Sequence, residues 1–140
     1  MSSRESPSGR RPTDPVGAAF LGEAVGSARQ FALDQGLGTR DRAHICIIVE
    51  ELVANLIDYG GRNGDPEISL EFARVAGAVT LVIYDNGRPF DPRNAPAKAN
   101  VPVRGGGAGL RLVSAWSEIV GYQSGDGRNR LELNMPLTGA

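Results

Sequence analysis

Two polar residues stand one helical turn apart inside a strongly apolar stretch of the chain. Glu51 and Asn55 are separated by four positions, so in a helix both side chains project from one face. A carboxylate and an amide buried in an apolar helix cost free energy unless a partner satisfies them. A hydrated Mg²⁺ is such a partner, because an asparagine oxygen is a hard ligand and a carboxylate can hold a water or hydroxyl. The alternative is a solvent-facing half of a helix, and the spacing alone favours that alternative.

A second candidate is the turn Asp85-Asn86-Gly87, which follows an apolar run that is typical of a strand. Gly87 permits backbone conformations that other residues avoid, so a ligand could approach the main chain there. The Asp85 carboxylate would then accept a hydrogen bond from an exocyclic amine. Asp-Asn-Gly is also common turn chemistry, and the residues alone leave the two interpretations even.

A glycine-rich stretch precedes the last segment that is suited to a helix. It consists of Gly105, Gly106, Gly107, Ala108, Gly109 and Leu110, and Arg104 comes just before it. Glycines leave backbone N–H groups unobstructed at a helix start, where the helix dipole also favours negative charge, so the stretch has the features of a phosphate site. It is not the dinucleotide fingerprint, which needs a preceding strand and a Gly-x-Gly-x-x-Gly spacing. A flexible hinge is the alternative, and it is compatible with phosphate binding.

Composition restricts the class of protein. The 140 residues suit one domain, and the net charge of -1 gives no reason to expect nucleic acid as a partner. No apolar stretch approaches the roughly 20 residues that span a bilayer, so no membrane association is expected. Lys98 is the only lysine, which excludes a P-loop and the strand lysine of protein kinases. The single cysteine, Cys46, is predicted to be a buried structural thiol in a reducing cytoplasm.

Hydrophobic periodicity predicts the elements that must position these residues. The pattern predicts helices over about 14–36, 39–60 and 107–118 and strands over about 68–73, 79–84, 119–124 and 129–137. The second helix is apolar on nearly every side, so it must be covered on more than one face. The order ααββαββ predicts an α+β fold, a two-layer sandwich with three helices on one face of a mixed, mainly antiparallel sheet.

Two segments are predicted to lack regular structure. Residues 1–13 are polar and show no strand-like alternation, so we expect a disordered lead-in to a domain over 14–140. Residues 88–106 contain four prolines, and a long irregular loop inside a compact domain is usually a lid or a binding loop.

The three polar and glycine-rich patterns together resemble the ATPase superfamily shared by DNA gyrase, the heat-shock chaperone ATPases, sensor histidine kinases and MutL. The chain most resembles the stand-alone bacterial anti-sigma-factor serine kinases, over about residues 16–137. Glu51–Asn55 matches the family's N-box, Asp85–Pro92 its first glycine box and Gly106–Leu110 its second. Gly127–Leu133 is similar to the family's closing hairpin.

The resemblance implies a histidine-kinase-like ATPase fold that binds ATP and Mg²⁺ between the helices and the loop. It places Asn55 on the magnesium and Asp85 on the adenine, and it makes Glu51 the base that activates an attacking hydroxyl. Gly87 and the glycine-rich stretch would also contact the nucleotide. A cation of the loop would meet the γ-phosphate, and the sequence does not choose among the candidates Arg93, Lys98 and Arg104.

The resemblance also implies partners. Members phosphorylate a serine of an anti-anti-sigma (STAS-type) protein and act on a sigma factor, so a cytoplasmic regulator of transcription is expected, and a homodimer is compatible with it. The alternative is a non-catalytic ATP-binding module that sequesters a regulatory partner, but retention of Glu51 favours the enzyme. An output domain of a larger two-component kinase is disfavoured by the self-contained start and end. His44, the only histidine, is interpreted as structural, because the chain is too short to contain a phosphoacceptor helix pair.

The sequence departs from the family pattern at four places. Tyr59 stands where many relatives have a histidine, Pro89 replaces a common glycine, and Ala108 replaces a larger apolar residue. These three departures bear on details of the pocket. In addition, residues 1–13 show no strand pattern, whereas well-known relatives begin with a strand that belongs to the dimer interface.

Overall fold

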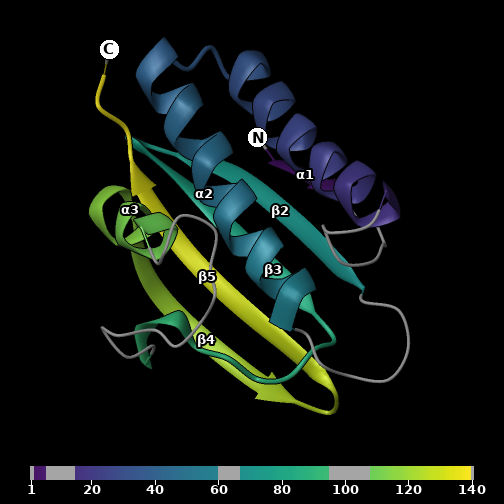
Figure 1. The fold of residues 1–140 in the computed structure, drawn as a ribbon. Helices are drawn as coiled ribbons and strands as arrows, with labels where there is room; N and C mark the ends of the chain where they lie inside the picture. The colour runs from purple at the N-terminus through teal and green to yellow at the C-terminus, as the bar shows by residue number, and fades with distance from the viewer. Residues whose placement is uncertain (1, 6–14, 60–66, 95–107, 140) are drawn as a thin grey trace.

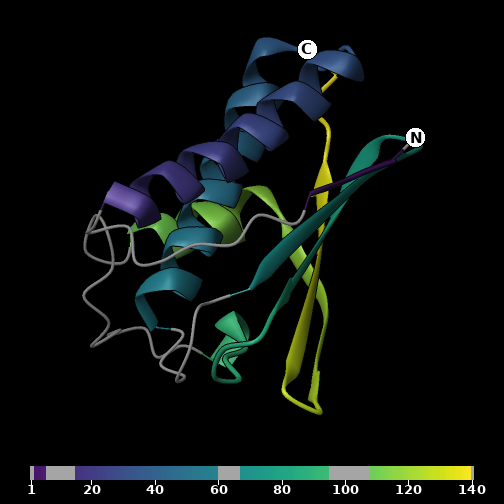
Figure 2. The ribbon, with the colours of Figure 1, turned by 90° about the vertical axis from the view of Figure 1, so that its right-hand side faces the viewer.

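The computed structural model describes residues 2–5, 15–59, 67–94 and 108–139. In these ranges the elements are β1 Ser2–Glu5, α1 Pro15–Asp34, α2 Thr39–Tyr59, β2 Ile68–Val75, β3 Ala78–Asp85, the 3-10 helix Pro92–Asn94, α3 Ala108–Trp116, β4 Glu118–Gly125 and β5 Arg128–Pro136. The helices lie together on one face of the sheet, which forms the second layer (Figures 1 and 2). The predicted α+β fold is confirmed, with the predicted order from α1 onward.

The sheet differs from the prediction in two ways. Its strand order is β1-β2-β3-β5-β4, and each neighbouring pair in the described residues is antiparallel, so the sheet is not mixed. The second difference is β1 itself, which pairs with β2 with Ser3 opposite Phe72. The prediction of a disordered lead-in over 1–13 is therefore wrong for residues 2–5, while residues 6–13 lie outside the described part. Strand pairing is made by backbone groups, which is why a polar tetrapeptide without alternation can form an edge strand.

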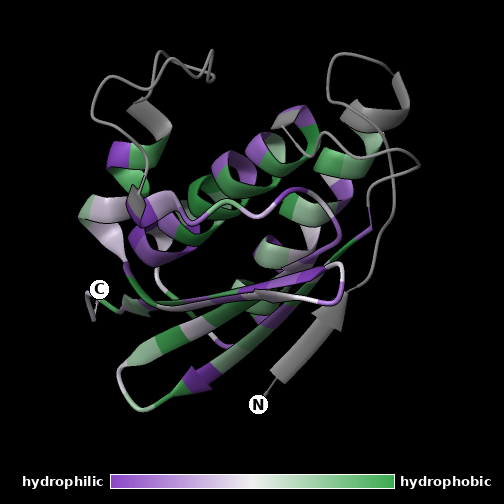
Figure 3. Cartoon of the chain, turned by 90° about the horizontal axis from the view of Figure 1, so that it is seen from below, coloured by the Kyte–Doolittle hydropathy of each residue, from purple (hydrophilic) through white to green (hydrophobic). Residues whose placement is uncertain are grey.

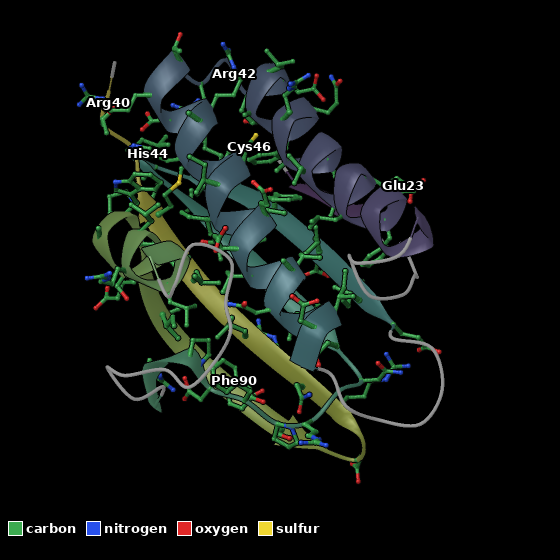
Figure 4. All side chains as sticks on the ribbon, viewed as in Figure 1. Glu23, Arg40, Arg42, His44, Cys46 and Phe90 are labelled. Atoms are coloured by element: carbon green, nitrogen blue, oxygen red, sulfur yellow. The ribbon has the colours of Figure 1, made fainter. Side chains whose placement is uncertain are left out.

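Helix α2 is the centre of the helical layer. Its apolar residues reach both neighbouring helices and the sheet, as expected for a helix that is apolar almost all round. The fully buried members are Ile45, Ile48, Val49, Leu52, Val53, Ala54 and Ile57. Cys46 is only half-buried, which corrects the prediction of a buried thiol, and burial still raises the pKa of that thiol. The cysteine lies on the side of α2 that is next to α1 (Figure 4).

Alternation along the strands decides which residues face the helices, and Figure 3 shows polar and apolar residues alternating along the strands. In β3 and β5 every second residue is buried; these residues are Val79, Leu81, Ile83 and Asp85, and Asn129, Leu131, Leu133 and Met135. Val82 of β3 is buried as well but does not belong to the core cluster. The row of buried residues in β3 therefore ends with the polar residue Asp85, and the row in β5 begins with the polar residue Asn129. Asp85 and Asn129 are directly opposite each other in the register, at the end of the sheet where the polar turn begins.

The closing hairpin has the predicted turn. Asp126 and Gly127 connect β4 to β5 and have φ angles of 54° and 75°. Two consecutive residues with positive φ are the requirement of a two-residue hairpin turn that matches the twist of the strands. The hairpin places Asn129 and Tyr122 on strands whose register is set by that turn.

The N-terminal half of α2 is tied to the C-terminal end of the chain. The Thr138 backbone N–H donates to both carboxylate oxygens of Asp41, at 3.0 and 3.1 Å, and Asp41 is 3% exposed. The His44 imidazole stacks on the Trp116 ring of α3, with centroids 3.8 Å apart and planes 7° from parallel. His44 thus lies in a packing contact between two helices.

Candidate functional site

A narrow pocket lies between α2, α3 and the end of the sheet. It is lined by Leu52, Asn55, Leu56, Ile83, Asp85, Phe90, Pro92, Leu110, Tyr122 and Leu131. Eight of these ten side chains are apolar or aromatic, and the two others are an amide and a carboxylate. Apolar walls with a few polar groups are typical of sites that bind a small organic molecule.

The pocket brings together residues from all three predicted motifs. Asn55 comes from α2, Asp85 from the end of β3 and Leu110 from the first turns of α3. Asn55 and Asp85 are 8% and 6% exposed, so both polar groups are largely removed from water. Glu51 lies one turn before Asn55 on α2, is half-buried, and is not among the residues that line the pocket. Its role as a base stays a prediction.

Hydrogen bonds hold the turn after β3. The Gly87 N–H donates to Asp85 Oδ2 at 2.8 Å, and Asn129 Nδ2 donates to the same oxygen at 3.1 Å. Asn129 Nδ2 also donates to the Gly87 carbonyl at 2.9 Å. Gly87 is therefore placed within the turn by contacts to both residues. These bonds fix the position of the Asp85 carboxylate, which is a requirement for selective recognition of a ligand.

Asn129 was not predicted as a site residue. It is 2% exposed, and Ser124 Oγ donates to its Oδ1 at 2.6 Å, which leaves its amide nitrogen directed at Asp85 and Gly87. A buried asparagine needs hydrogen-bond partners, so its presence on an inward position of β5 is a signal. That signal becomes readable only once the register of β5 against β3 is known.

Tyr122 and Phe90 form a second contact that sequence reasoning missed. The Phe90 backbone N–H donates to Tyr122 Oη at 2.7 Å, and both residues line the pocket. Burial raises the pKa of the Tyr122 phenol, so the ring carries a neutral hydroxyl at physiological pH. No pattern in the sequence of the β4 segment marks this tyrosine as different from other strand residues.

The segment after the turn is more regular than predicted. Residues 88–106 were expected to be irregular, but Pro92–Asn94 forms a 3-10 helix. The Asp91 carboxylate accepts a hydrogen bond from the Arg93 backbone N–H at 3.0 Å and from the guanidinium at 2.7 Å, and these bonds lower the pKa of Asp91. The fixed φ of Pro92 suits the start of such a turn. Arg93, one of the three predicted phosphate contacts, is bound to Asp91 in this structure.

The predicted phosphate-binding residues fall mostly outside the described part of the chain. Arg104, Gly105, Gly106 and Gly107 lie there, as does Lys98. Ala108 and Gly109 are the first described residues of α3, and the predicted start at Gly107 lies outside the described residues. Their contact with a phosphate group, like that of Arg104, stays a prediction.

The fold and the pocket together define a class of protein. An antiparallel sheet carries helices on one face, and a helix asparagine meets a strand-ending Asp-x-Gly turn in a largely apolar pocket. This is the arrangement of a histidine-kinase-like ATPase domain. The chain belongs to the histidine kinase-like ATPase domain family, whose sequence model matches residues 18–135.

Individual relatives agree with this assignment. The chain is 29% identical over 123 residues to the serine/threonine-protein kinase BtrW of Bordetella bronchiseptica, covering 84% of this chain and 87% of the relative. Two solved structures share the fold, the histidine kinase domain and a longer chain of the blue-light activated histidine kinase EL346 of Erythrobacter litoralis, with TM-scores of 0.52 and 0.55 at 17% identity. Each match covers 86% of this chain but only 60% and 41% of those two chains. Within the described residues, no helix combines the length and hydrophobicity needed to cross a membrane.

Proposed function

We propose that this chain binds Mg-ATP and transfers the γ-phosphoryl group to a serine of an anti-anti-sigma (STAS-type) protein, and that it regulates transcription through a sigma factor. The observation that carries the proposal is the shared pocket of Asn55, Asp85 and Leu110, which come from three separate motifs. The similarity to a relative named as a serine/threonine-protein kinase supports transfer to a hydroxyl group.

The adenine lies at the Asp85 end of the pocket. Asp85 accepts a hydrogen bond from the exocyclic amine of the base, and its position is fixed by the bonds from Gly87 and Asn129. Leu52, Ile83 and Leu131 line the pocket and provide apolar surface against which the base would pack. A carboxylate with fixed geometry distinguishes an amino group from a carbonyl at the same position, because a carbonyl offers no proton.

The magnesium ion is held at Asn55. An amide oxygen is a suitable hard ligand, and Mg²⁺ commonly keeps several waters and takes further oxygens from the phosphates of the substrate. Asn55 fits this role because it lines the pocket that holds Asp85 while belonging to a different layer. When bound, the ion neutralises charge on the phosphates. Asn55 itself orients the ion and the phosphate end of the nucleotide relative to α2.

Glu51 is the general base. It is one turn from Asn55 on the same helical face and half-buried, so a carboxylate stands near the phosphate end of the site. The serine hydroxyl of the partner attacks the γ-phosphorus, the bond to the β-phosphate oxygen breaks, ADP leaves, and Glu51 takes the hydroxyl proton. The nucleophile therefore comes from the partner protein and not from this chain.

A direct experiment mixes the chain with ATP, Mg²⁺ and a candidate anti-anti-sigma protein and follows the intact mass of the partner. We expect the partner to gain the mass of one phosphoryl group, on a serine. Binding of ATP by calorimetry without any transfer to a partner that forms a complex would favour the non-catalytic module. Absence of ATP binding would refute both functions.

A further inference from the structure

We propose that Tyr122 is a positioning residue for the base end of the nucleotide; this proposal rests on the proposed function. The Tyr122 hydroxyl fixes the main chain at Phe90 and so places the Phe90 ring as a wall of the pocket. Tyr122 lies outside the motifs that predicted the site, whereas Phe90 belongs to the first glycine box, Asp85–Pro92.

Two rows of side chains cross the sheet at the pocket. The first, called here the polar row, is formed by Ser124, Asn129 and Asp85, which are opposite one another on β4, β5 and β3. The second, called the apolar row, is formed by Tyr122, Leu131 and Ile83 on the same three strands. All three members of the apolar row line the pocket. Tyr122 is thus the outermost residue of the pocket floor, on the edge strand.

The two rows hold the two ends of one short loop. Asn129 of the polar row binds the start of the loop at Asp85 and Gly87. Tyr122 of the apolar row binds its end, because Tyr122 Oη accepts the Phe90 N–H at 2.7 Å. The loop is therefore anchored to β5 at one end and to β4 at the other. A shift of either anchor would change the width of the pocket mouth.

Phe90 has surface available for a ligand. The residue lines the pocket yet remains 38% exposed, and it lies at the far end of the domain from His44 (Figure 4). Immediately beyond it, Asp91 and Arg93 close a local ion pair. Among the described contacts of Phe90, the hydrogen bond to Tyr122 joins the Phe90 main chain to the sheet.

The test is calorimetry on the full chain with adenosine, ADP and a non-hydrolysable ATP analogue. Tyr122→Phe keeps the ring and removes the acceptor. Loss of one hydrogen bond that orders a binding wall should weaken binding by roughly 3- to 10-fold. The factor should be the same for all three ligands, because Phe90 adjoins the Asp85 end of the pocket, and in a transfer assay KM for ATP should rise while kcat is unchanged.

A matched control is Tyr84→Phe. Tyr84 lies on β3 opposite Arg130, whose guanidinium carbon is 5.9 Å from the centre of the ring, and Tyr84 does not line the pocket. We expect wild-type affinity in this variant. A double-mutant cycle with Phe90→Ala then tests the route, since Tyr122→Phe should have little further effect once the Phe90 ring is gone.

The outcomes separate the two levels of the hypothesis. If the wild-type chain binds none of the three ligands, the proposed function is refuted and the role of Tyr122 with it. If the wild-type chain binds but Tyr122→Phe binds equally well, only the role of Tyr122 is refuted. An effect of Tyr122→Phe that persists at full size in the Phe90→Ala background would also refute positioning through Phe90.

Discussion

Both halves of helix α2 carry polar residues into an apolar core. Those of the first half contact other parts of the chain, whereas Asn55 in the second half faces a pocket. In the first half, Asp41 binds the backbone of Thr138 and His44 stacks on Trp116. In the second half, Asn55 lines a pocket together with Asp85. Asp41 and Asn55 are 3% and 8% exposed, so burial does not distinguish them. What distinguishes them is whether the polar group faces another part of the chain or a space that a ligand can fill.

The largest expected effect is on catalysis, in the second half of α2. Glu51→Gln keeps size and hydrogen bonding but removes basicity, so phosphoryl transfer should fall by roughly 10²–10⁴-fold while nucleotide binding survives. Phosphorylation of the partner, followed by intact mass, measures the rate. The matched control is Glu50→Gln, the neighbouring half-buried glutamate of α2, which should transfer at the wild-type rate. A wild-type rate in Glu51→Gln would mean that this carboxylate is structural.

The next effect concerns affinity. Asp85→Asn and Asn55→Ala should each weaken binding of Mg-ATP by roughly 10- to 100-fold, because each removes an interaction with a charged group or ion worth about 1.5–3 kcal/mol. Calorimetry measures both constants. Asp126→Asn is the control for the charge change, since this residue is exposed and asparagine tolerates its positive φ of 54°. Unchanged affinity in both site variants would refute the assignment of the pocket.

Asn129→Ala tests a residue with two roles, because Asn129 stabilises the fold and also holds the Asp85 carboxylate of the pocket. Removing a buried amide that makes three hydrogen bonds should lower the free energy of unfolding by about 1–3 kcal/mol and weaken nucleotide binding as well. Asn134→Ala, on the outer face of the same strand, should change stability by no more than about 0.5 kcal/mol. Denaturant unfolding and calorimetry on both variants give the comparison. A loss of stability with wild-type affinity would show that Asn129 stabilises the fold but has no part in nucleotide binding.

The smallest effect is expected in the first half of α2. Asp41→Asn keeps an acceptor for the Thr138 N–H but removes the charge near the helix start, so the free energy of unfolding should fall by about 0.3–1 kcal/mol. Nucleotide affinity should not change, because Asp41 does not line the pocket. A change in affinity would show that the two halves of α2 are coupled and would contradict a purely structural role for the first half.

Local patterns were sufficient to predict most of the fold. Helix α2 was predicted from its apolar residues, and the last hairpin from Asp126 and Gly127, because helical periodicity and turn chemistry depend on neighbours in the sequence. Strand β1 was missed because its pairing uses backbone groups that every residue possesses. The mixed sheet was wrong for a related reason, since strand direction depends on which strands become neighbours.

The site was predictable only where a motif is continuous in sequence. Asn55, Asp85 and Leu110 were predicted through the family resemblance, and the pocket joins them. Asn129 and Tyr122 were not predicted, since their importance depends on the register that sets them opposite Asp85 and Leu131 through β5. A register between distant strands is a property of the assembled sheet and leaves little trace in one sequence.

Because His44 stacks on Trp116, the intrinsic fluorescence of Trp116 can report on the position of α3. Trp116 is the only tryptophan, and it ends the short helix whose other end begins at Ala108, beside the predicted phosphate-binding glycines. A nine-residue helix is about 13 Å long, so a tilt of about 10° about the stacked end displaces the other end by about 2 Å. Indole emission depends on contact with the imidazole beside it. Motion of α3 can therefore be timed in a stopped-flow fluorimeter on the unlabelled wild-type chain.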